Sequence, residues 1–171
     1  MSTSNNRYPE VSLEGLDRSE NGVSVVIASY RAPADTLLCL QSLAAQTLDR
    51  QRFEVILVVN GGAAADVTAY RRFAEEHPGL RMRIVRSPLA GACHSLNLGI
   101  ASARMNWVTF VDDDDTVSPQ YLEGLLSVAA EGVMPLTRID DVTPNGLSRE
   151  DNRINDQIRP LLGMVVPPED S

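Results

Sequence analysis

The sequence predicts a three-layer α/β protein, in which a mostly parallel β-sheet lies between helices on its two faces. Over residues 23–131, strand-like and helix-like segments alternate four times, which is the pattern of parallel strands joined by crossover helices. The first two strand-like segments are nearly continuous runs of β-branched and apolar residues, as expected where both faces of a strand are buried. A length of 171 residues suits one compact domain.

The predicted elements follow one another in a regular order. Strands are expected at residues 23–29, 53–60, 81–86 and 107–112, and 133–140 is a candidate fifth strand. Helices are expected at residues 33–44, 64–77, 93–103 and 118–131. Pro33 and Asp35 stand where the first helix would begin, and Pro78 follows the second helix. We expect a flexible arm at 1–21, a folded domain at 22–141, and an irregular segment and tail at 142–171, with a short helix near 151–162.

Composition excludes several classes of function. The net charge is −8, and all 15 basic side chains are Arg. This balance argues against a nucleic-acid footprint and against a polybasic membrane anchor. Without Lys, Schiff-base chemistry and a Walker A phosphate loop are excluded. No run of about 18 apolar residues is present, and the polar N-terminus lacks a signal core, so a cytoplasmic protein without a transmembrane segment is expected. Cys39 and Cys93 lack metal-site spacing and are expected to be free thiols.

The feature with the clearest chemistry is the acidic run, defined as Asp112, Asp113, Asp114 and Asp115, which directly follows an apolar strand. In an open α/β sheet, ligands bind beyond the carboxyl ends of the strands. If the pleat continued, alternate aspartates would face opposite sides, and one pair could converge on a hard cation. Oxygen ligands favour Mg²⁺ or Mn²⁺. The alternative is a solvated loop that binds nothing.

Four segments together resemble glycosyltransferase family 2. They are the first-strand run 25–30 (VVIASY), the second-strand end 58–62 (VVNGG), the segment from Gly91 through 95–100 (SLNLGI), and the Asp-x-Asp motif within 110–115 (FVDDDD). Their order and spacing agree with that family over roughly residues 22–131. The resemblance implies the GT-A fold, a Rossmann-like nucleotide-sugar-binding architecture, for residues 22–141.

The resemblance also implies roles for individual residues. Asp114 would be the principal ligand of Mg²⁺ or Mn²⁺, helped by Asp112, which would also face the ribose. The other residues implied in nucleotide binding are Ala28, Ser29, Tyr30, Asn60, Asn97 and Asp113. The implied reaction is metal-dependent glycosyl transfer from a nucleoside-diphosphate sugar, with a UDP-sugar favoured, to an unknown acceptor. Simpler interpretations stay open: Ser29 and Tyr30 as plain strand-end residues, and Asn60 as part of a turn with Gly61.

The sequence also departs from the family pattern. Val59 and Asn60 replace an acidic pair, and Leu96 stands where Arg is frequent, so the nucleotide site lacks a cation that the family often has. The family's domain normally continues well beyond the Asp-x-Asp motif and supplies the acceptor site and general base there. Only 56 residues follow Asp115, so we expect a donor-binding half truncated in its C-terminal part, with no catalytic base assigned. Homo-oligomerisation is left open.

Three other functions compete with this hypothesis. A non-catalytic nucleotide-sugar-binding or interaction module would keep the same fold and the acidic run. A haloacid-dehalogenase-type phosphatase would use Asp112 and Asp114 as its nucleophile motif. That motif normally opens the first strand of the core, whereas here it closes about the fourth, and the required Lys is missing. A dinucleotide-binding domain is disfavoured because no Gly-x-Gly-x-x-Gly follows the first strand.

Overall fold

The core of the fold is a parallel sheet of four strands in the order β3-β2-β1-β4. In a computed structural model, residues 20–30, 33–61, 67–87, 89, 91–129, 141–143 and 146–148 are described. The strands are β1 (Glu20–Ser29), β2 (Phe53–Val59), β3 (Met82–Arg86) and β4 (Met105–Phe110). Each predicted strand within the described residues is present, with bounds shifted by up to three residues.

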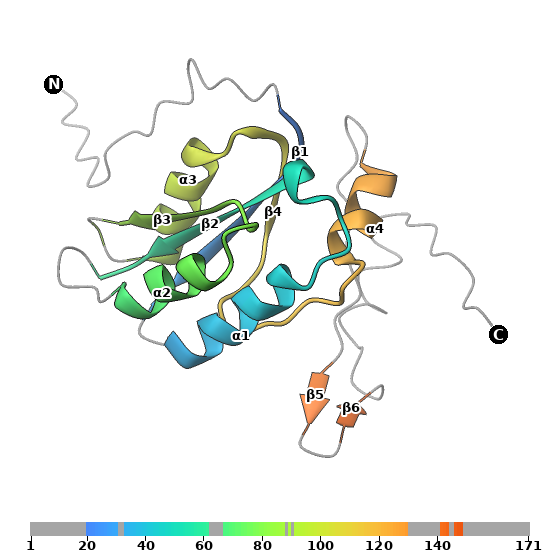
Figure 1. Ribbon diagram of the computed structural model, residues 1–171. Coiled ribbons are helices and arrows are strands. Elements are labelled where there is room, and N and C mark those ends of the chain that lie inside the picture. The colour runs from blue at the N-terminus through green and yellow to red at the C-terminus, as the bar shows by residue number, and fades with distance from the viewer. Residues whose placement is uncertain are drawn as a thin grey trace, which may run out of the picture. The chain divides into compact units, whose positions relative to one another are not determined.

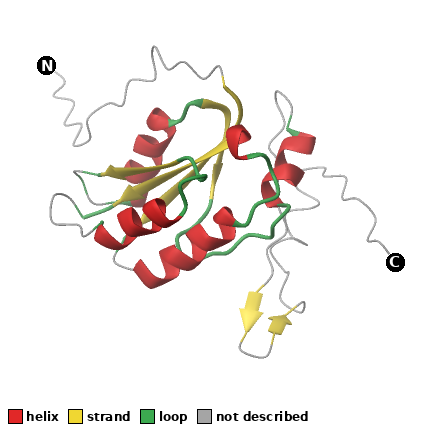
Figure 2. Cartoon of the chain, viewed as in Figure 1, coloured by secondary structure: helices red, strands yellow, loops and turns green. Residues whose placement is uncertain are grey.

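Helices cover both faces of the sheet, as predicted (Figures 1 and 2). One face carries α1 (Pro33–Ala44), α2 (Thr68–Glu76) and α4 (Tyr121–Val128), and the other carries α3 (Ala92–Ser102). The described residues between 20 and 129 therefore form the three-layer α/β/α sandwich that the alternating pattern indicated.

The pleat of the two central strands divides the core between these faces. Odd-numbered residues of β1 and β2 join the larger cluster with α1, α2 and α4, whereas Val26, Ile56 and Val58 form a smaller cluster with α3. Because both clusters exclude water, β1 and β2 are buried along almost their whole length. This burial is the physical reason for their continuous apolar sequence.

Close packing of α3 against β1 depends on Gly99. A Cβ atom built at this position would overlap Val26 Cγ1 and would lie 3.2 Å from Val26 Cγ2. Both residues are buried. The absence of a side chain at Gly99 thus lets the helix approach the sheet, and this explains the glycine of the segment that includes Asn97.

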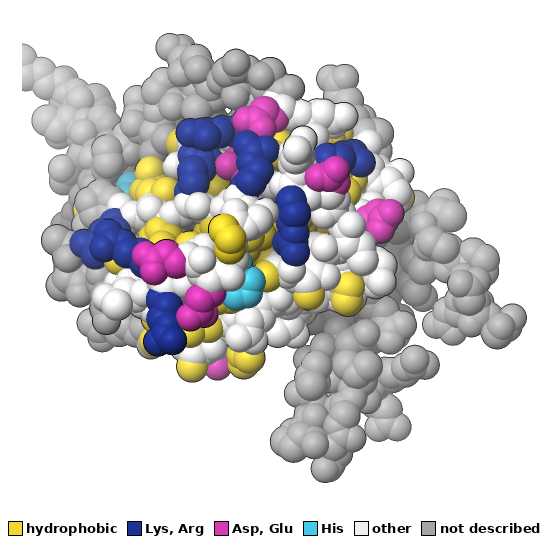
Figure 3. Space-filling model, viewed as in Figure 1, with side chains coloured by type: hydrophobic (Ala, Val, Ile, Leu, Met, Phe, Trp, Pro, Cys, Tyr) yellow, Lys and Arg dark blue, Asp and Glu magenta, His cyan; other side chains and the backbone are white. Residues whose placement is uncertain are grey.

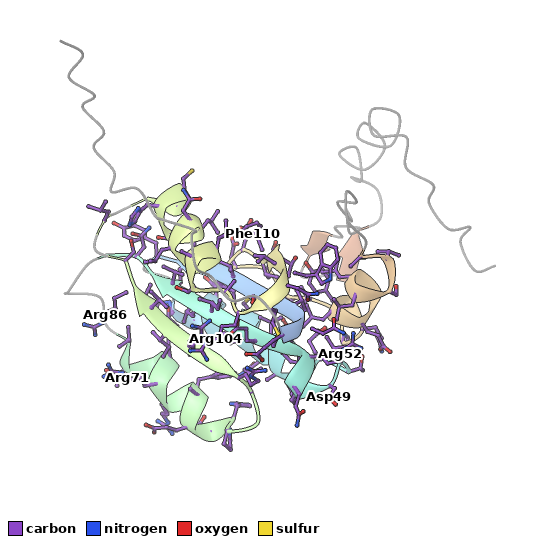
Figure 4. All side chains as sticks on the ribbon, turned by 90° about the horizontal axis from the view of Figure 1, so that it is seen from above. Asp49, Arg52, Arg71, Arg86, Arg104 and Phe110 are labelled. Carbon is purple, nitrogen blue, oxygen red and sulfur yellow. The ribbon has the colours of Figure 1, made fainter. Side chains whose placement is uncertain are left out.

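A cluster of polar side chains lies at the amino-terminal ends of the strands. Glu54 is 3% exposed and accepts hydrogen bonds from Ser24 Oγ (2.8 Å), Arg104 N (2.8 Å) and Arg83 Nη2 (2.9 Å). Figure 4 shows Arg52 at this side of the domain and Arg86 at the opposite, carboxyl side. Since its partners are in place, Glu54 is a structural residue that ties β1, β2, β3 and the start of β4 together.

The chain divides into two compact units, Met1–Glu131 and Gly132–Ser171. In the second unit the structure describes a short antiparallel hairpin of β5 (Asp141–Thr143) and β6 (Gly146–Ser148). This hairpin was not predicted, because three-residue strands are too short to show a period. The candidate strand at 133–140, the helix near 151–162 and the arm at 1–21 fall, wholly or almost wholly, outside the described residues.

Candidate functional site

The candidate site lies where the strand order reverses. From β1 the chain continues through α1 to β2 on one side, and β4 pairs with β1 on its other side. Such a switch point, at the carboxyl ends of the strands, is where open α/β sheets bind ligands. Phe110 pairs with Val26, so the acidic run begins alongside the last residues of β1.

The acidic run is attached to β1 through Asp113. The Asp113 carboxylate oxygen Oδ2 accepts hydrogen bonds from Tyr30 N (3.2 Å) and from Thr36 Oγ1 (3.3 Å). Thr36 Oγ1 lies 2.8 Å from Ser29 Oγ, which lies 3.1 Å from the Tyr70 hydroxyl. Three of these groups are buried, because Ser29, Thr36 and Tyr70 are at most 3% exposed. A continuous polar network thus joins β1, α1, α2 and the acidic run.

The prediction that the strand pleat continues through the four aspartates is wrong. β4 ends at Phe110, and Asp115 N donates a hydrogen bond to Asp112 O (3.2 Å), which closes a turn. A turn does not send alternate side chains to opposite faces as a strand does. Asp112, Asp114 and Asp115 are exposed, whereas Asp113 is half-buried. The acidic run therefore presents three carboxylates to solvent and one to the end of β1.

The exit of the acidic run is held by the end of α1. Gln46 is buried; its Nε2 donates to Ser118 O (2.7 Å) and its Oε1 accepts from Leu122 N (2.9 Å). Ser42 Oγ accepts from Val117 N (3.1 Å). With Thr36 at its first turn and Gln46 just past its last, α1 fixes both sides of the acidic run.

Electrostatic repulsion is concentrated in this loop. Partial desolvation raises the pKa of the largely exposed Asp115 carboxyl, and the charges of Asp112 and Asp114 raise it further. Beneath the loop, burial raises the pKa of the Cys39 thiol to about 12, with added contributions from the aspartates, of which Asp113 is the largest. A cation at the acidic run would relieve this repulsion.

The end of β2 is tied to the loop before α3 through Asn60, which is 8% exposed. With the amide oriented to satisfy both groups, its nitrogen donates to Leu89 O (2.9 Å) and its oxygen accepts from Gly91 N (3.1 Å). Asn60 N also donates to Ser29 O (2.8 Å). Gly91 has a φ of 132°, which favours glycine. Asn60 therefore holds three chain segments together at the carboxyl edge.

The other predicted site residues are spread around this edge. Ala28 is half-buried near the end of β1, and the Tyr30 side chain is 49% exposed just beyond it. Asn97 is exposed in the second turn of α3. Tyr30 N thus donates directly to Asp113, Ser29 is joined to Asp113 through Thr36, and Asn60 N donates to Ser29 O. Among the described residues, no hydrogen bond joins Asn97 to this group.

Thr36, Tyr70 and Gln46 belong to the site's framework and were not predicted. Thr36 and Tyr70 lie in helices, where a polar side chain is ordinarily solvated, and nothing in their local spacing marks them. The available signal was their position, because Thr36 and Tyr70 fall on helix faces that otherwise carry apolar residues such as Leu40 and Phe73.

The described residues hold no preformed metal cage, since no group of three or more His, Cys, Asp or Glu side chains is arranged to enclose an ion. An all-oxygen donor set nevertheless suits Mg²⁺ or Mn²⁺, which commonly take one or two carboxylates and complete their shell with substrate phosphates and water. The acidic run therefore fits a cation that binds together with a phosphorylated ligand.

Arginines do not form a continuous basic surface on the face shown in Figure 3, where acidic and uncharged side chains separate them. No helix among the described residues is long and apolar enough to cross a membrane.

Comparisons with known proteins agree on one family. The family model described as Glycosyl transferase family 2 matches residues 24–161. The uncharacterized glycosyltransferase YibD of Escherichia coli (strain K12) is 35% identical over 113 residues, which are 66% of this chain and 32% of YibD. This chain thus spans about a third of the length of that curated relative.

Solved structures show the same fold. Mannosyltransferase PcManGT from Pyrobaculum calidifontis, in complex with GDP-Man and Mn²⁺, superposes with a TM-score of 0.59 at 26% identity, covering 68% of this chain and 35% of that one. TarS 1-349 from S. aureus, in complex with UDP-GlcNAc, superposes with a TM-score of 0.54 at 23% identity, covering 62% and 30%. The second likeness supports the fold alone.

Proposed function

Because the chain belongs to glycosyl transferase family 2, we propose that it binds a nucleoside-diphosphate sugar together with a divalent cation, for transfer of the glycosyl group to an acceptor. One observation carries the proposal: Tyr30 N and Thr36 Oγ1 both donate to Asp113, so the acidic run is anchored at the switch point of the sheet. This arrangement sets carboxylates beside the site where an open α/β sheet binds its ligand.

Asp114 and Asp112 are the proposed ligands of Mg²⁺ or Mn²⁺. Both are exposed, and their charges already raise the pKa of Asp115, so a cation there would be favoured electrostatically. When bound with the donor, the cation would offset the negative charge that develops on the departing nucleoside diphosphate. The chain's own contribution is to hold the carboxylates in place through Asp113 and the end of α1.

The nucleotide would occupy the carboxyl edge between β1, β2 and α3. Ala28 and Tyr30 would line it at the end of β1, where the fully buried Ser29 would act only through its hydrogen bonds, and Tyr30 offers a half-exposed aromatic ring for contact with the base. Asn97 would approach from α3. Asn60 acts on this site by shaping the loop at Gly91, since its side-chain amide is engaged there. Asp113 would act from the acidic run.

We propose a UDP-sugar as donor, and the related structures carry both UDP-GlcNAc and GDP-Man. The proposal is tested by calorimetric titration of UDP and GDP into the full chain, with and without Mn²⁺. We expect Mn²⁺-dependent binding of UDP that is lost in Asp114→Asn. Glu75→Gln is the matched control, because it removes one negative charge from an exposed position on α2.

The outcomes separate the parts of the proposal. Preference for GDP would correct the donor but keep the site. Binding without hydrolysis or transfer of the sugar nucleotide would indicate a binding module. No binding of either nucleotide with the metal present would refute the proposed function.

A further inference from the structure

We propose that the buried hydroxyl chain, made of Tyr70, Ser29 and Thr36, is a positioning device that sets the geometry of Asp113 and, through it, of the acidic run. Its effect on ligand binding rests on the proposed function, whereas its effect on the loop does not. None of these hydroxyls needs to contact substrate to act in this way.

The order of the hydrogen bonds follows from the number of protons. A carboxylate has no proton to donate, so Thr36 Oγ1 donates its single hydrogen to Asp113 Oδ2 (3.3 Å). Thr36 must then accept from Ser29 Oγ (2.8 Å), and Ser29 must accept from the Tyr70 hydroxyl (3.1 Å). Every hydroxyl of the chain therefore points toward the acidic run.

Because all the hydrogen bonds of the buried hydroxyl chain run in one direction, each of them is stronger than it would be alone. Each hydroxyl that accepts a hydrogen bond becomes a better donor to the next group, and the effect is larger in a buried site than in water. Ser29 and Thr36 are fully buried and Tyr70 is 3% exposed, so water does not compete for these bonds. The carboxylate at the end also makes the last bond charge-assisted.

The three residues of the buried hydroxyl chain come from three separate elements. Tyr70 comes from α2, Thr36 from the first turn of α1, and Ser29 from the end of β1. Ser29 faces these helices because it continues the odd-numbered face of β1, which packs against α1 and α2. The position of Asp113 thus depends on the packing of both helices, and a shift of either helix would displace the acidic run.

Two substitutions of Thr36 separate the effect of its hydroxyl from the effect of its shape. Thr36→Val keeps the β-branched shape but removes the hydroxyl, and Thr36→Ser keeps the hydroxyl. The matched control is Ser24→Ala, which removes another buried hydroxyl that donates to Glu54 (2.8 Å) at the amino edge, away from the acidic run. Any general effect of losing a buried hydroxyl would appear in Ser24→Ala as well.

Two readouts are measured in conditions where all variants are folded. The first is amide hydrogen exchange of Tyr30 without ligand, since this amide donates to Asp113 Oδ2 (3.2 Å). The second is the calorimetric affinity for UDP in the presence of Mn²⁺. In Thr36→Val we expect the Tyr30 amide to exchange at least about fivefold faster and the affinity to fall by about fivefold or more, as for the loss of a hydrogen bond to a charged group.

The same measurements can overturn the inference. Thr36→Ser should stay within about twofold of the wild type in both readouts, and Ser24→Ala should lower stability while leaving both unchanged. The inference fails if Thr36→Val leaves the exchange rate of the Tyr30 amide unchanged. It also fails if Thr36→Ser changes the exchange rate and the affinity as much as Thr36→Val does. If the wild type does not bind UDP, the proposed function fails, and the exchange measurement still decides the inference.

Discussion

A methyl group added at Gly99 is expected to push α3 away from β1 and destabilise the domain. The new Cβ would overlap Val26 Cγ1, and its distances to Val26 Cγ2 (3.2 Å) and Cβ (3.3 Å) also fall short of ordinary carbon–carbon contact. Val26 is fully buried, so it has no free space to move into. Overpacking of this kind costs about 1–3 kcal/mol or more, and the helix propensity of Ala returns up to about 1 kcal/mol.

We therefore expect Gly99→Ala to lower the free energy of unfolding by about 1–2 kcal/mol. Urea denaturation followed by circular dichroism measures it, and Gly124→Ala in α4 is the matched control. A Cβ at Gly124 has nothing within 4 Å, so this variant should be stabilised by up to about 1 kcal/mol. Adding Val26→Ala to Gly99→Ala should recover part of the loss. Equal stabilisation by both glycine substitutions would refute the packing argument.

Three further predictions concern Asn60, the two cysteines and Asp115. Asn60→Asp can accept from Gly91 N but cannot donate to Leu89 O when ionised, so denaturation should show a loss of about 1–3 kcal/mol, and a stable variant would show that the amide donor is dispensable. At pH 8, iodoacetamide should modify exposed Cys93 once per native chain and spare Cys39, whose pKa is about 12; two adducts by mass spectrometry would contradict this. Because the pKa of Asp115 is raised in the folded state, stability should fall as pH rises through that pKa, and Asp115→Asn should remove this loss in denaturation curves measured across the acidic range.

The alkaline side of the stability profile depends on Cys39. In the unfolded chain a thiol ionises near pH 9, but in the fold Cys39 keeps its proton to about pH 12. The folded state binds more protons between these values, so stability is intact below about pH 9 and falls above it. Cys39→Ala should remove this part of the decline, at the cost of the packing contacts of a fully buried side chain.

The architecture could be predicted from sequence because burial on both faces leaves a strong compositional signature. Strands β1 and β2 are apolar along almost their whole length, and this pattern has few alternative explanations. The rule for open α/β sheets then predicts a ligand site at the acidic run, because the run follows the carboxyl end of β4. The observed hydrogen bonds from Tyr30 and Thr36 to Asp113 agree with that location.

Contacts within the site were less predictable, since they depend on tertiary structure. The sequence predicts a strand pleat that continues to Asp115, whereas β4 ends at Phe110 and a turn follows. Thr36 and Tyr70 are separated by 34 positions and meet only because both helices pack on the same sheet face through Ser29. The contacts of the Asn60 side chain with Leu89 and Gly91 likewise join segments about 30 residues apart, so the sequence alone does not reveal them.

The central claim is that a divalent cation and a nucleotide bind together at the acidic run, and paramagnetic broadening by Mn²⁺ tests it most directly. Amide NMR signals are recorded with UDP present while Mn²⁺ is added at substoichiometric amounts. We predict broadening centred on residues 112–115 and on Tyr30, none at Glu54 on the amino edge, and loss of the effect in Asp114→Asn but not in Glu75→Gln. Broadening that spares the acidic run, or that persists unchanged in Asp114→Asn, would contradict the account.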